Sequence, residues 1–273
     1  MGSLEATEQR KELSVLVTGF GPFKEAYPVN PAWKIAERLP DYLPADRAKD
    51  AVAAHRSPAN VPPVRIVKLP GPVHTSYEYT RALVPTLWGD GDNGHGGHGG
   101  HDERADGIGL GRIDYAVHIG MAGPQLVYSL ERRGHRDGYD SRDVDGKLLE
   151  DEPRRAQEGE RWIWHGVPEE LLSDLDVDDV HRRWVERSPK NLSLRVSEDA
   201  GHYLCDFIYF SSLAHLWKQQ RQRKVAFLHV PLHSDPESIN RGVELVLTLI
   251  RSIVESELEK KQEKQETEET SQS

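Results

Sequence analysis

The sequence has almost no cysteine. Cys205 is the one cysteine among 273 residues, so no disulfide can form within the chain. That composition fits a reducing compartment. A single cysteine is more often a buried packing residue than a nucleophile, so the count alone does not establish catalysis.

Long apolar runs are also absent. No stretch reaches the length needed to cross a bilayer. The first residues, MGSLEATEQRKEL, are polar and unlike a secretory signal. Gly2 does not begin a myristoylation motif, because Ala6 stands where that motif needs Ser or Thr. We therefore expect a soluble, cytoplasmic protein without a membrane partner.

Positive charge is in short supply. Lysine and arginine total 35 against 45 aspartate and glutamate, which gives a formal net charge of −10. A chain of this sign repels polyanions, so we expect no nucleic-acid partner. Much of the acid lies in the C-terminal tail, and the folded part is closer to neutral.

Strand-like and helix-like segments alternate along the chain. The sequence predicts strands at 14–20, 64–70, 113–120, 126–132, 192–197 and 225–231. It predicts helices at 31–39, 74–88, 177–187 and 200–218, and a last one capped by Ser234 or Asp235. The pattern is typical of a three-layer α/β/α sandwich with a twisted, largely parallel central sheet. Ligands in such folds bind beyond the carboxyl ends of the strands.

The predicted organisation is a single domain with polar segments around it. The domain spans 13–257, between a disordered start at 1–12 and a disordered charged tail at 258–273. A glycine- and histidine-rich insertion at about 89–107 is predicted to be disordered because it cannot bury apolar surface. Its His95, His98 and His101 form a loose metal-binding tract, but a flexible loop lacks the rigid geometry of a metal site. We expect no metal and no cofactor.

Cys205 lies near the start of a predicted helix that Ser197 or Asp199 could cap. A helix N-terminus favours an anion, so this position favours the thiolate, which is the nucleophilic form. The alternative is a cysteine packed beneath the helix with Phe207 and Ile208.

Two further residues could complete a catalytic set. His229 lies near the end of a buried strand and could exchange a proton with Cys205, although His233 in the next turn competes for that role. Glu131 ends another strand and could orient the imidazole. The alternatives are a structural histidine and a surface ion pair of Glu131 with Arg132 or Arg133.

Phe20 and Phe23 lie in GFGPF, directly after the first strand. The glycine spacing does not fit a dinucleotide-binding loop. Two phenylalanines at a strand end could form an apolar slot for a flat, neutral ring, or they could simply pack in the core.

In order along the chain, six segments resemble the pyroglutamyl peptidase I family of cysteine peptidases, also called pyrrolidone-carboxylate peptidases. They are VTGFGPF, VNPAW, VHIGMAG, the segment around LERRGHRDGY, DAGHYLCDF and FLHVP. The resemblance runs from about Ser14 to Ser256 and is closest to the animal form. It implies a thiol protease, an omega peptidase that removes N-terminal pyroglutamate from peptides.

The resemblance also implies roles for particular residues. Cys205, His229 and Glu131 match the family's triad, and Phe20 and Phe23 match its ring pocket. Gly120 and Met121 match the segment that contacts the lactam, but Met121 replaces a glutamine of bacterial members. Backbone groups around Gly120–Ala122 could replace that contact. Arg142 lies near the position of a bacterial oxyanion-binding arginine but is offset, so that role is not transferred.

The resemblance leaves other questions open. It favours a monomer, with a homo-oligomer still possible. One alternative is a peptidase of the same mechanism with a different N-terminal specificity, and another is a non-catalytic binding protein of the same fold.

Overall fold

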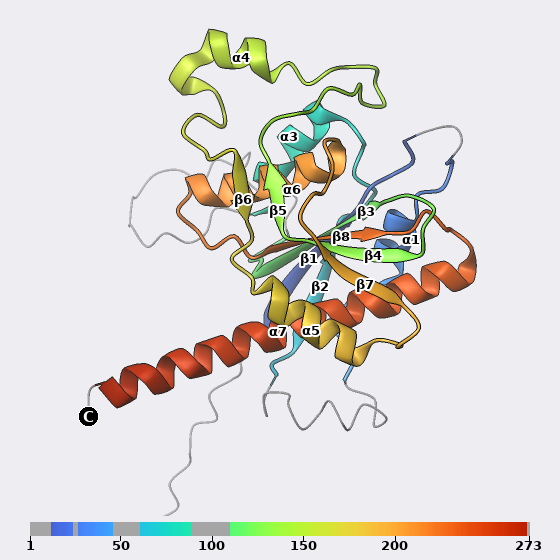
Figure 1. Cartoon of the computed structure of the whole chain (residues 1–273), viewed down its shortest axis with the longest axis vertical. Helices are drawn as coiled ribbons and strands as arrows, with labels where there is room; N and C mark the ends of the chain where they lie inside the picture. The colour runs from blue at the N-terminus through green and yellow to red at the C-terminus, as the bar shows by residue number, and fades with distance from the viewer. Residues whose placement is uncertain (1–11, 24–26, 46–60, 89–109, 272–273) are drawn as a thin grey trace, which may run out of the picture.

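The computed structural model describes residues 12–23, 27–45, 61–88 and 110–271 (Figure 1). The predicted disordered start, except for residue 12, lies outside these residues. The glycine- and histidine-rich insertion also lies outside them. The predicted tail lies mostly within them.

A six-stranded sheet forms the centre of the fold. Its strands are β1 (Leu13–Gly19), β2 (Val64–Lys68), β3 (Tyr115–Met121), β4 (Val127–Glu131), β7 (Ser193–Ser197) and β8 (Val225–Val230), in the order β2-β1-β3-β8-β4-β7. Four of the five neighbouring pairs are parallel, and β4 pairs with β8 in the antiparallel direction. The predicted α/β class with a largely parallel sheet is confirmed. The sequence did not reveal that β4 and β7 run opposite to the other four strands.

Helices cover both faces of this sheet. On one face lie α1 (Pro31–Arg38), α5 (Val177–Arg187) and α7 (Pro236–Ser271), packed on strand residues such as Val117 and Leu228. On the other lie α3 (Tyr77–Leu87) and α6 (Leu204–Lys218), packed on the alternate residues such as Ala116 and Phe227. Figure 1 shows these two helical layers with the sheet between them.

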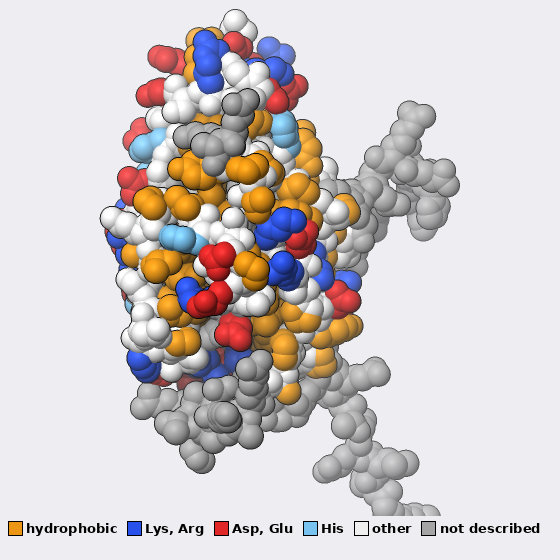
Figure 2. Space-filling model, turned by 90° about the vertical axis from the view of Figure 1, so that its right-hand side faces the viewer, with side chains coloured by type: hydrophobic (Ala, Val, Ile, Leu, Met, Phe, Trp, Pro, Cys, Tyr) orange, Lys and Arg blue, Asp and Glu red, His pale blue; other side chains and the backbone are white. Residues whose placement is uncertain are grey.

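Shorter elements fill the stretch between β4 and α5. β5 (Arg133–His135) pairs antiparallel with β6 (Glu170–Leu172), and α4 (Asp151–Glu158) continues into the 3₁₀ turn η2 (Gly159–Arg161). On the face drawn in Figure 2, acidic and basic side chains are interspersed with apolar ones, so neither charge sign forms a continuous patch there.

A buried histidine joins the sheet to α6. His118 Nδ1 lies 2.7 Å from Thr18 Oγ1 on β1, and its Nε2 lies 2.9 Å from Ser212 Oγ on α6. Burial lowers the pKa of His118 to about 3, so the ring stays neutral at physiological pH. Both ring nitrogens are therefore used to hold β1, β3 and α6 together.

The end of the chain differs from the sequence prediction. Residues 258–271 continue α7 as a helix, whereas we predicted a disordered tail from residue 258. Glutamate, lysine and glutamine are good helix formers, and the Lys264 ammonium lies 3.8 Å from the Glu268 carboxylate one turn away. The polar tail can therefore extend a helix whose apolar stripe is already packed on the sheet.

Gly19 allows α1 to approach the end of β1. A Cβ atom here would overlap the backbone carbonyl of Ala32 and lie 2.8 Å from Trp33 Cα. We predict that Gly19→Ala destabilises the fold by about 1–3 kcal/mol, because backbone must move to admit the methyl group. Urea unfolding monitored by circular dichroism measures this change.

The matched control is Gly71→Ala. No heavy atom lies within 4 Å of a Cβ built at Gly71, so its unfolding midpoint should stay close to that of the wild type. Equal midpoints for the Gly19 and Gly71 variants would contradict the proposed close approach.

Candidate active site

Cys205 is the second residue of α6, which begins later than predicted. Tyr203 is the N-cap residue and makes no side-chain capping hydrogen bond. The predicted caps do not reach the helix: Ser197 Oγ donates to the carbonyl of Asp199, and Asp199 Oδ1 accepts from the Gly201 amide. Gly201 has a φ of +83°, which turns the chain before α6 starts. This prediction of the cap was therefore wrong.

The start of α6 leaves backbone donors near the thiol. The N–H of Cys205 is in the first turn, where amides have no acceptor within their own helix. Such amides, at the positive end of the helix dipole, favour an anion.

Gly120 on β3 makes room for the sulfur. A Cβ atom at Gly120 would lie 2.7 Å from Cys205 Sγ and 2.6 Å from Phe227 Cζ. Real side chains do not approach this closely, so only glycine lets the sulfur lie against the strand. Gly120, predicted from the resemblance to contact substrate, lies here beside the thiol.

His229 and Glu131 meet across the antiparallel pair β8–β4. His229 is opposite Ser129, and Glu131 is opposite Phe227. Residues two apart share a face, so Glu131 is the diagonal neighbour of His229 on the face toward α6. The His229 Nδ1 and Glu131 Oε1 atoms are 2.8 Å apart. Both side chains are buried, with relative exposures of 9% for His229 and 2% for Glu131.

This geometry corrects the route by which Glu131 reaches the site. In a fully parallel sheet, the carboxyl ends of β4 and β8 would lie at the same edge. Because β4 runs the other way, Glu131 lies deeper along β8 than His229 and approaches the imidazole from beneath. The competitor His233 lies in the turn after β8, and its buried Nδ1 has no hydrogen-bond partner among the described residues.

The electrostatics favour a charged pair. Burial alone would lower the pKa of His229, but the negative charge and hydrogen bond of Cys205 raise it, followed by the hydrogen bond and charge of Glu131. The net effect raises the pKa of His229 from 6.5 to about 10. The ring therefore favours the imidazolium form at neutral pH, and it lies between the Cys205 sulfur and the Glu131 side chain.

A small recess opens beside the sulfur. It contains about 300 Å³ of empty space, counting its open mouth. Its lining residues are Phe20, Phe23, Asn30, Thr75, Met121, Tyr203, Leu204 and Cys205. The predicted Phe20, Phe23 and Met121 are thus brought together at the cysteine.

Sequence reasoning missed the other lining residues. Asn30 stood out only as a helix cap, and it does cap α1: its Oδ1 accepts from the Ala32 amide at 3.0 Å. Tyr203 directly precedes the helix, and its ring lies 6.4 Å from that of Phe23. Thr75 lies in a loop far from the cysteine in the sequence, where no local pattern marked it.

Within the part of the chain that the structure describes, one cluster of side chains could accept a metal ion. Ligand atoms of His135, His202 and Asp206 lie within 4.8 Å of one another. Asp206 is already engaged, since its carboxylate accepts hydrogen bonds from the amide and Nδ1 of His135 and from the Tyr139 hydroxyl. These bonds fasten β5 to the first turn of α6. The histidines of the predicted loose tract, at positions 95, 98 and 101, lie outside the described residues.

The contacts of Arg142 give no support for a role at the Cys205 sulfur. Its guanidinium donates to the Gly146 carbonyl at 2.6 Å, while its own carbonyl accepts from the Tyr203 hydroxyl at 3.2 Å. It therefore supports the recess wall through its backbone.

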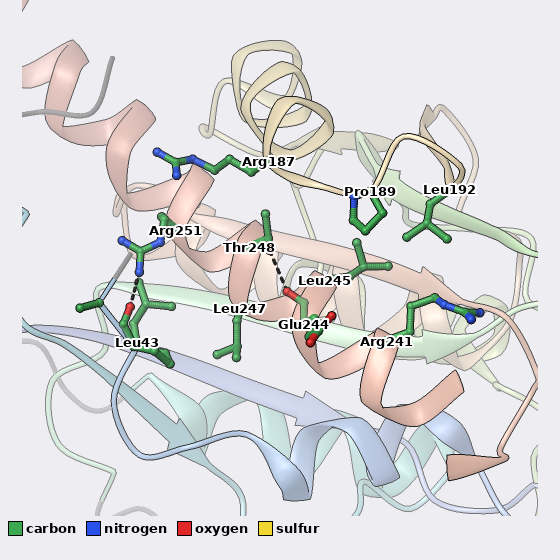
Figure 3. Close-up of a pocket in the computed structure, with 12 residues that line it drawn as sticks. Leu43, Arg187, Pro189, Leu192, Arg241, Glu244, Leu245, Leu247, Thr248 and Arg251 are labelled. Carbon is green, nitrogen blue, oxygen red and sulfur yellow. Dashed lines mark hydrogen bonds between the residues drawn. The ribbon is translucent and has the colours of Figure 1, made fainter. Parts of the chain in front are cut away.

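A larger groove lies on the opposite face of the sheet (Figure 3). It runs between α7, the end of α5 and the segment around Leu43, and three arginines line it. Arg187 pairs with Glu255 at 2.8 Å, Arg241 pairs with Glu237 at 2.5 Å, and Arg251 donates to the Pro44 carbonyl. Its charges are thus largely compensated, and it lies far from the cysteine across the sheet.

Comparison with known proteins identifies relatives of this chain. No family model matches. Pyroglutamyl-peptidase 1 of Mus musculus and that of Homo sapiens are each 27% identical over 245 residues, which cover 89% of this chain and 91% of each relative. The chain is a homologue of the pyroglutamyl peptidases.

Solved structures share the fold of this pyroglutamyl-peptidase homologue. The pyroglutamyl peptidase I of Bacillus amyloliquefaciens superposes with a TM-score of 0.60 at 18% identity, covering 89% of this chain and 96% of that one. A pyrrolidone carboxyl peptidase mutant of Pyrococcus furiosus gives a TM-score of 0.59 at 22% identity, covering 89% and 99%. Within the described residues, no helix is long and apolar enough to span a membrane.

The charged pair generates a direct test. We predict that His229 titrates near pH 10 in the wild type, and that Cys205→Ala lowers its pKa by roughly one pH unit or more, because a neighbouring negative charge is removed. Glu131→Gln should also lower it. Nitrogen-15 NMR of labelled histidine follows the titration, with the signal assigned by its absence in His229→Gln.

His118 provides the internal control: burial alone lowers its pKa to about 3, so its ring should stay neutral in all of these variants. An unchanged His229 pKa in Cys205→Ala would contradict a thiolate–imidazolium pair.

Proposed function

We propose that the chain is a cysteine peptidase that removes the N-terminal pyroglutamyl residue from peptides, with Cys205 as nucleophile, His229 as acid and base, and Glu131 as the residue that orients His229. One observation carries the proposal. The sulfur of Cys205 faces the His229 ring, which the buried Glu131 side chain holds from the other side, beside a small recess without acidic residues among its described lining, in a homologue of pyroglutamyl peptidases.

The first half of the reaction forms a thioester. The Cys205 thiolate attacks the pyroglutamyl carbonyl carbon, and the carbonyl oxygen becomes an oxyanion that accepts hydrogen bonds from amides at the start of α6, including that of Cys205. His229 then gives its proton to the nitrogen of the leaving peptide as the C–N bond breaks. The remaining peptide departs with a free amine, and the pyroglutamyl group stays on the sulfur.

The second half releases the acid. Neutral His229 takes a proton from a water molecule, which attacks the thioester carbon. The C–S bond breaks, the thiolate returns, and pyroglutamate leaves. Glu131 holds Nδ1 of the ring throughout, so that Nε2 faces the reacting atoms and the imidazolium is stabilised when it forms. No step requires a metal or an organic cofactor.

The recess supports the substrate assignment through its lack of acid. None of its described lining residues is aspartate or glutamate. An ordinary N-terminus carries an ammonium group that would lose hydration there without gaining a partner. A pyroglutamyl ring is uncharged and has two apolar faces, which suit the flanking Phe20 and Phe23 rings.

The proposal extends to the setting of the enzyme. A nucleophilic thiolate needs reducing conditions, and the single cysteine of the chain fits the cytoplasm. We further propose a monomer, which light scattering on the purified chain would test; a defined dimer or tetramer mass would overturn that part.

The activity test uses a fluorogenic amide of pyroglutamate under reducing conditions. We predict that Cys205→Ala and His229→Ala lower kcat/KM by about 10⁴-fold or more, because the members of a triad act as one unit. Circular dichroism should show both variants folded. Full activity in Cys205→Ala would exclude the proposed nucleophile.

A substrate panel separates the closest alternative. The substrates carry an acetyl, a pyroglutamyl or a prolyl group at the N-terminus, and all of them share one leaving group. Cleavage of the pyroglutamyl amide alone supports the proposal. Preference for another N-terminal group would indicate the same mechanism with a different specificity.

A further inference from the structure

The recess beside Cys205 has few polar groups to offer a ligand. Its apolar walls come from Phe20, Phe23, Met121 and Leu204. The five-membered lactam that the proposed substrate would place here has a polar edge, with one N–H donor and one carbonyl acceptor. Some group in the recess must meet that edge, or its hydrogen bonds to water are lost on binding without replacement.

Most polar side chains of the recess are already engaged. The Asn30 amide nitrogen donates to the Gly21 carbonyl at 2.8 Å, and its oxygen accepts from the Ala32 amide at 3.0 Å. The Tyr203 hydroxyl donates to the Arg142 carbonyl at 3.2 Å. Cys205 is reserved for the attack on the substrate.

Thr75 is different. The residue is only 4% exposed, and its buried Oγ1 has no hydrogen-bond partner among the described residues. A buried hydroxyl without a partner costs free energy in the folded state, so it is uncommon unless something else occupies it. Its position in the lining of the recess indicates what that occupant could be.

The backbone holds this hydroxyl in a fixed place. Just before it, Val73 pairs with the end of β1, because its amide donates to the Gly19 carbonyl at 2.9 Å and its carbonyl accepts from the Gly21 amide at 2.9 Å. Just after it, the Tyr77 amide donates to Asp143 at 3.1 Å. The Thr75 carbonyl itself accepts from the Val144 amide at 3.3 Å. Thr75 is thus anchored on both sides.

We infer that the Thr75 hydroxyl is the hydrogen-bonding partner for the polar edge of the lactam ring. This inference rests on the proposed function and deepens it. A hydroxyl can accept from the lactam N–H or donate to the ring carbonyl. The thioether of Met121, which stands at the position predicted to contact the lactam, is only a weak acceptor. Thr75 supplies the polar contact that Met121 cannot.

The test compares Thr75→Val with Thr75→Ser on the pyroglutamyl amide. Valine keeps the shape and removes the hydroxyl, so kcat/KM should fall by about 10- to 100-fold, mostly through KM. The serine variant keeps the hydroxyl, so its kcat/KM should stay within about threefold of the wild-type value. Thr75→Ala serves as a second variant without the hydroxyl if the valine variant does not fold.

Two further measurements separate recognition from structure. Thr75→Val should melt at or above the wild-type temperature, because it loses an unpaired buried hydroxyl; a structural role would lower it. The rate at which iodoacetamide alkylates Cys205 should not change, because the triad is untouched.

Binding of the unreactive ring 2-pyrrolidone tests the contact without catalysis. Its inhibition constant should rise in Thr75→Val by a similar factor, whereas that of cyclopentane, a five-membered ring without a polar edge, should not. Wild-type kcat/KM and unchanged 2-pyrrolidone inhibition in Thr75→Val would overturn the inference and leave the proposed function standing. An inactive wild type would instead overturn the proposed function.

Discussion

The antiparallel pairing of β4 with β8 is the constraint on which the site depends. It makes β4 run antiparallel to β8. As a result Glu131 lies opposite Phe227, further from the carboxyl end of β8 than His229. The carboxylate therefore meets the imidazole inside the sheet–helix interface, where both are buried. Charges interact more strongly in such surroundings than in water, so the contacts of His229 with Cys205 and Glu131 raise the pKa of the ring despite its burial. A carboxylate at the open edge of a parallel sheet would be solvated and would hold the ring less firmly.

The second requirement is that α6 cannot rotate or slide against the sheet. Three contacts fix it: the missing side chain of Gly120 admits the sulfur, His118 reaches Ser212 further along the helix, and Asp206 is held by β5. Cys205 and its neighbour Asp206 project in different directions from the helix, so Cys205 faces the strand that carries His229 while Asp206 faces β5. Fixing the acidic residue therefore fixes the orientation of the thiol. The neutral His118 adds to this without introducing another charge near the pair.

Local patterns in the sequence were sufficient for the fold class but not for the directions of the strands. Hydrophobic runs mark a buried strand equally well in either direction, so the sequence could not show that β4 is reversed. It therefore could not show how deep along β8 Glu131 meets His229. The start of α6 was missed because Ser197 and Asp199 fit a capping pattern, while Gly201 turns the chain before the helix can form. Thr75 could not be found from the sequence at all, since only the packing of its loop against the end of β1 brings it to the cysteine.

The site also bears a cost in stability that fits its chemistry. Glu131 Oε2 and Thr75 Oγ1 are both buried without hydrogen-bond partners among the described residues. Donors around Oε2 would draw the carboxylate charge away from the imidazolium, so leaving that oxygen unpaired keeps the charge directed at His229. The N-terminus of α6, which no side chain caps, follows the same logic, because a capping oxygen would compete with the oxyanion for the same amides. Each unmade bond weakens the free protein and, in the proposed mechanism, is available to a reacting group. This is how the proposed site would bind the transition state more tightly than the substrate.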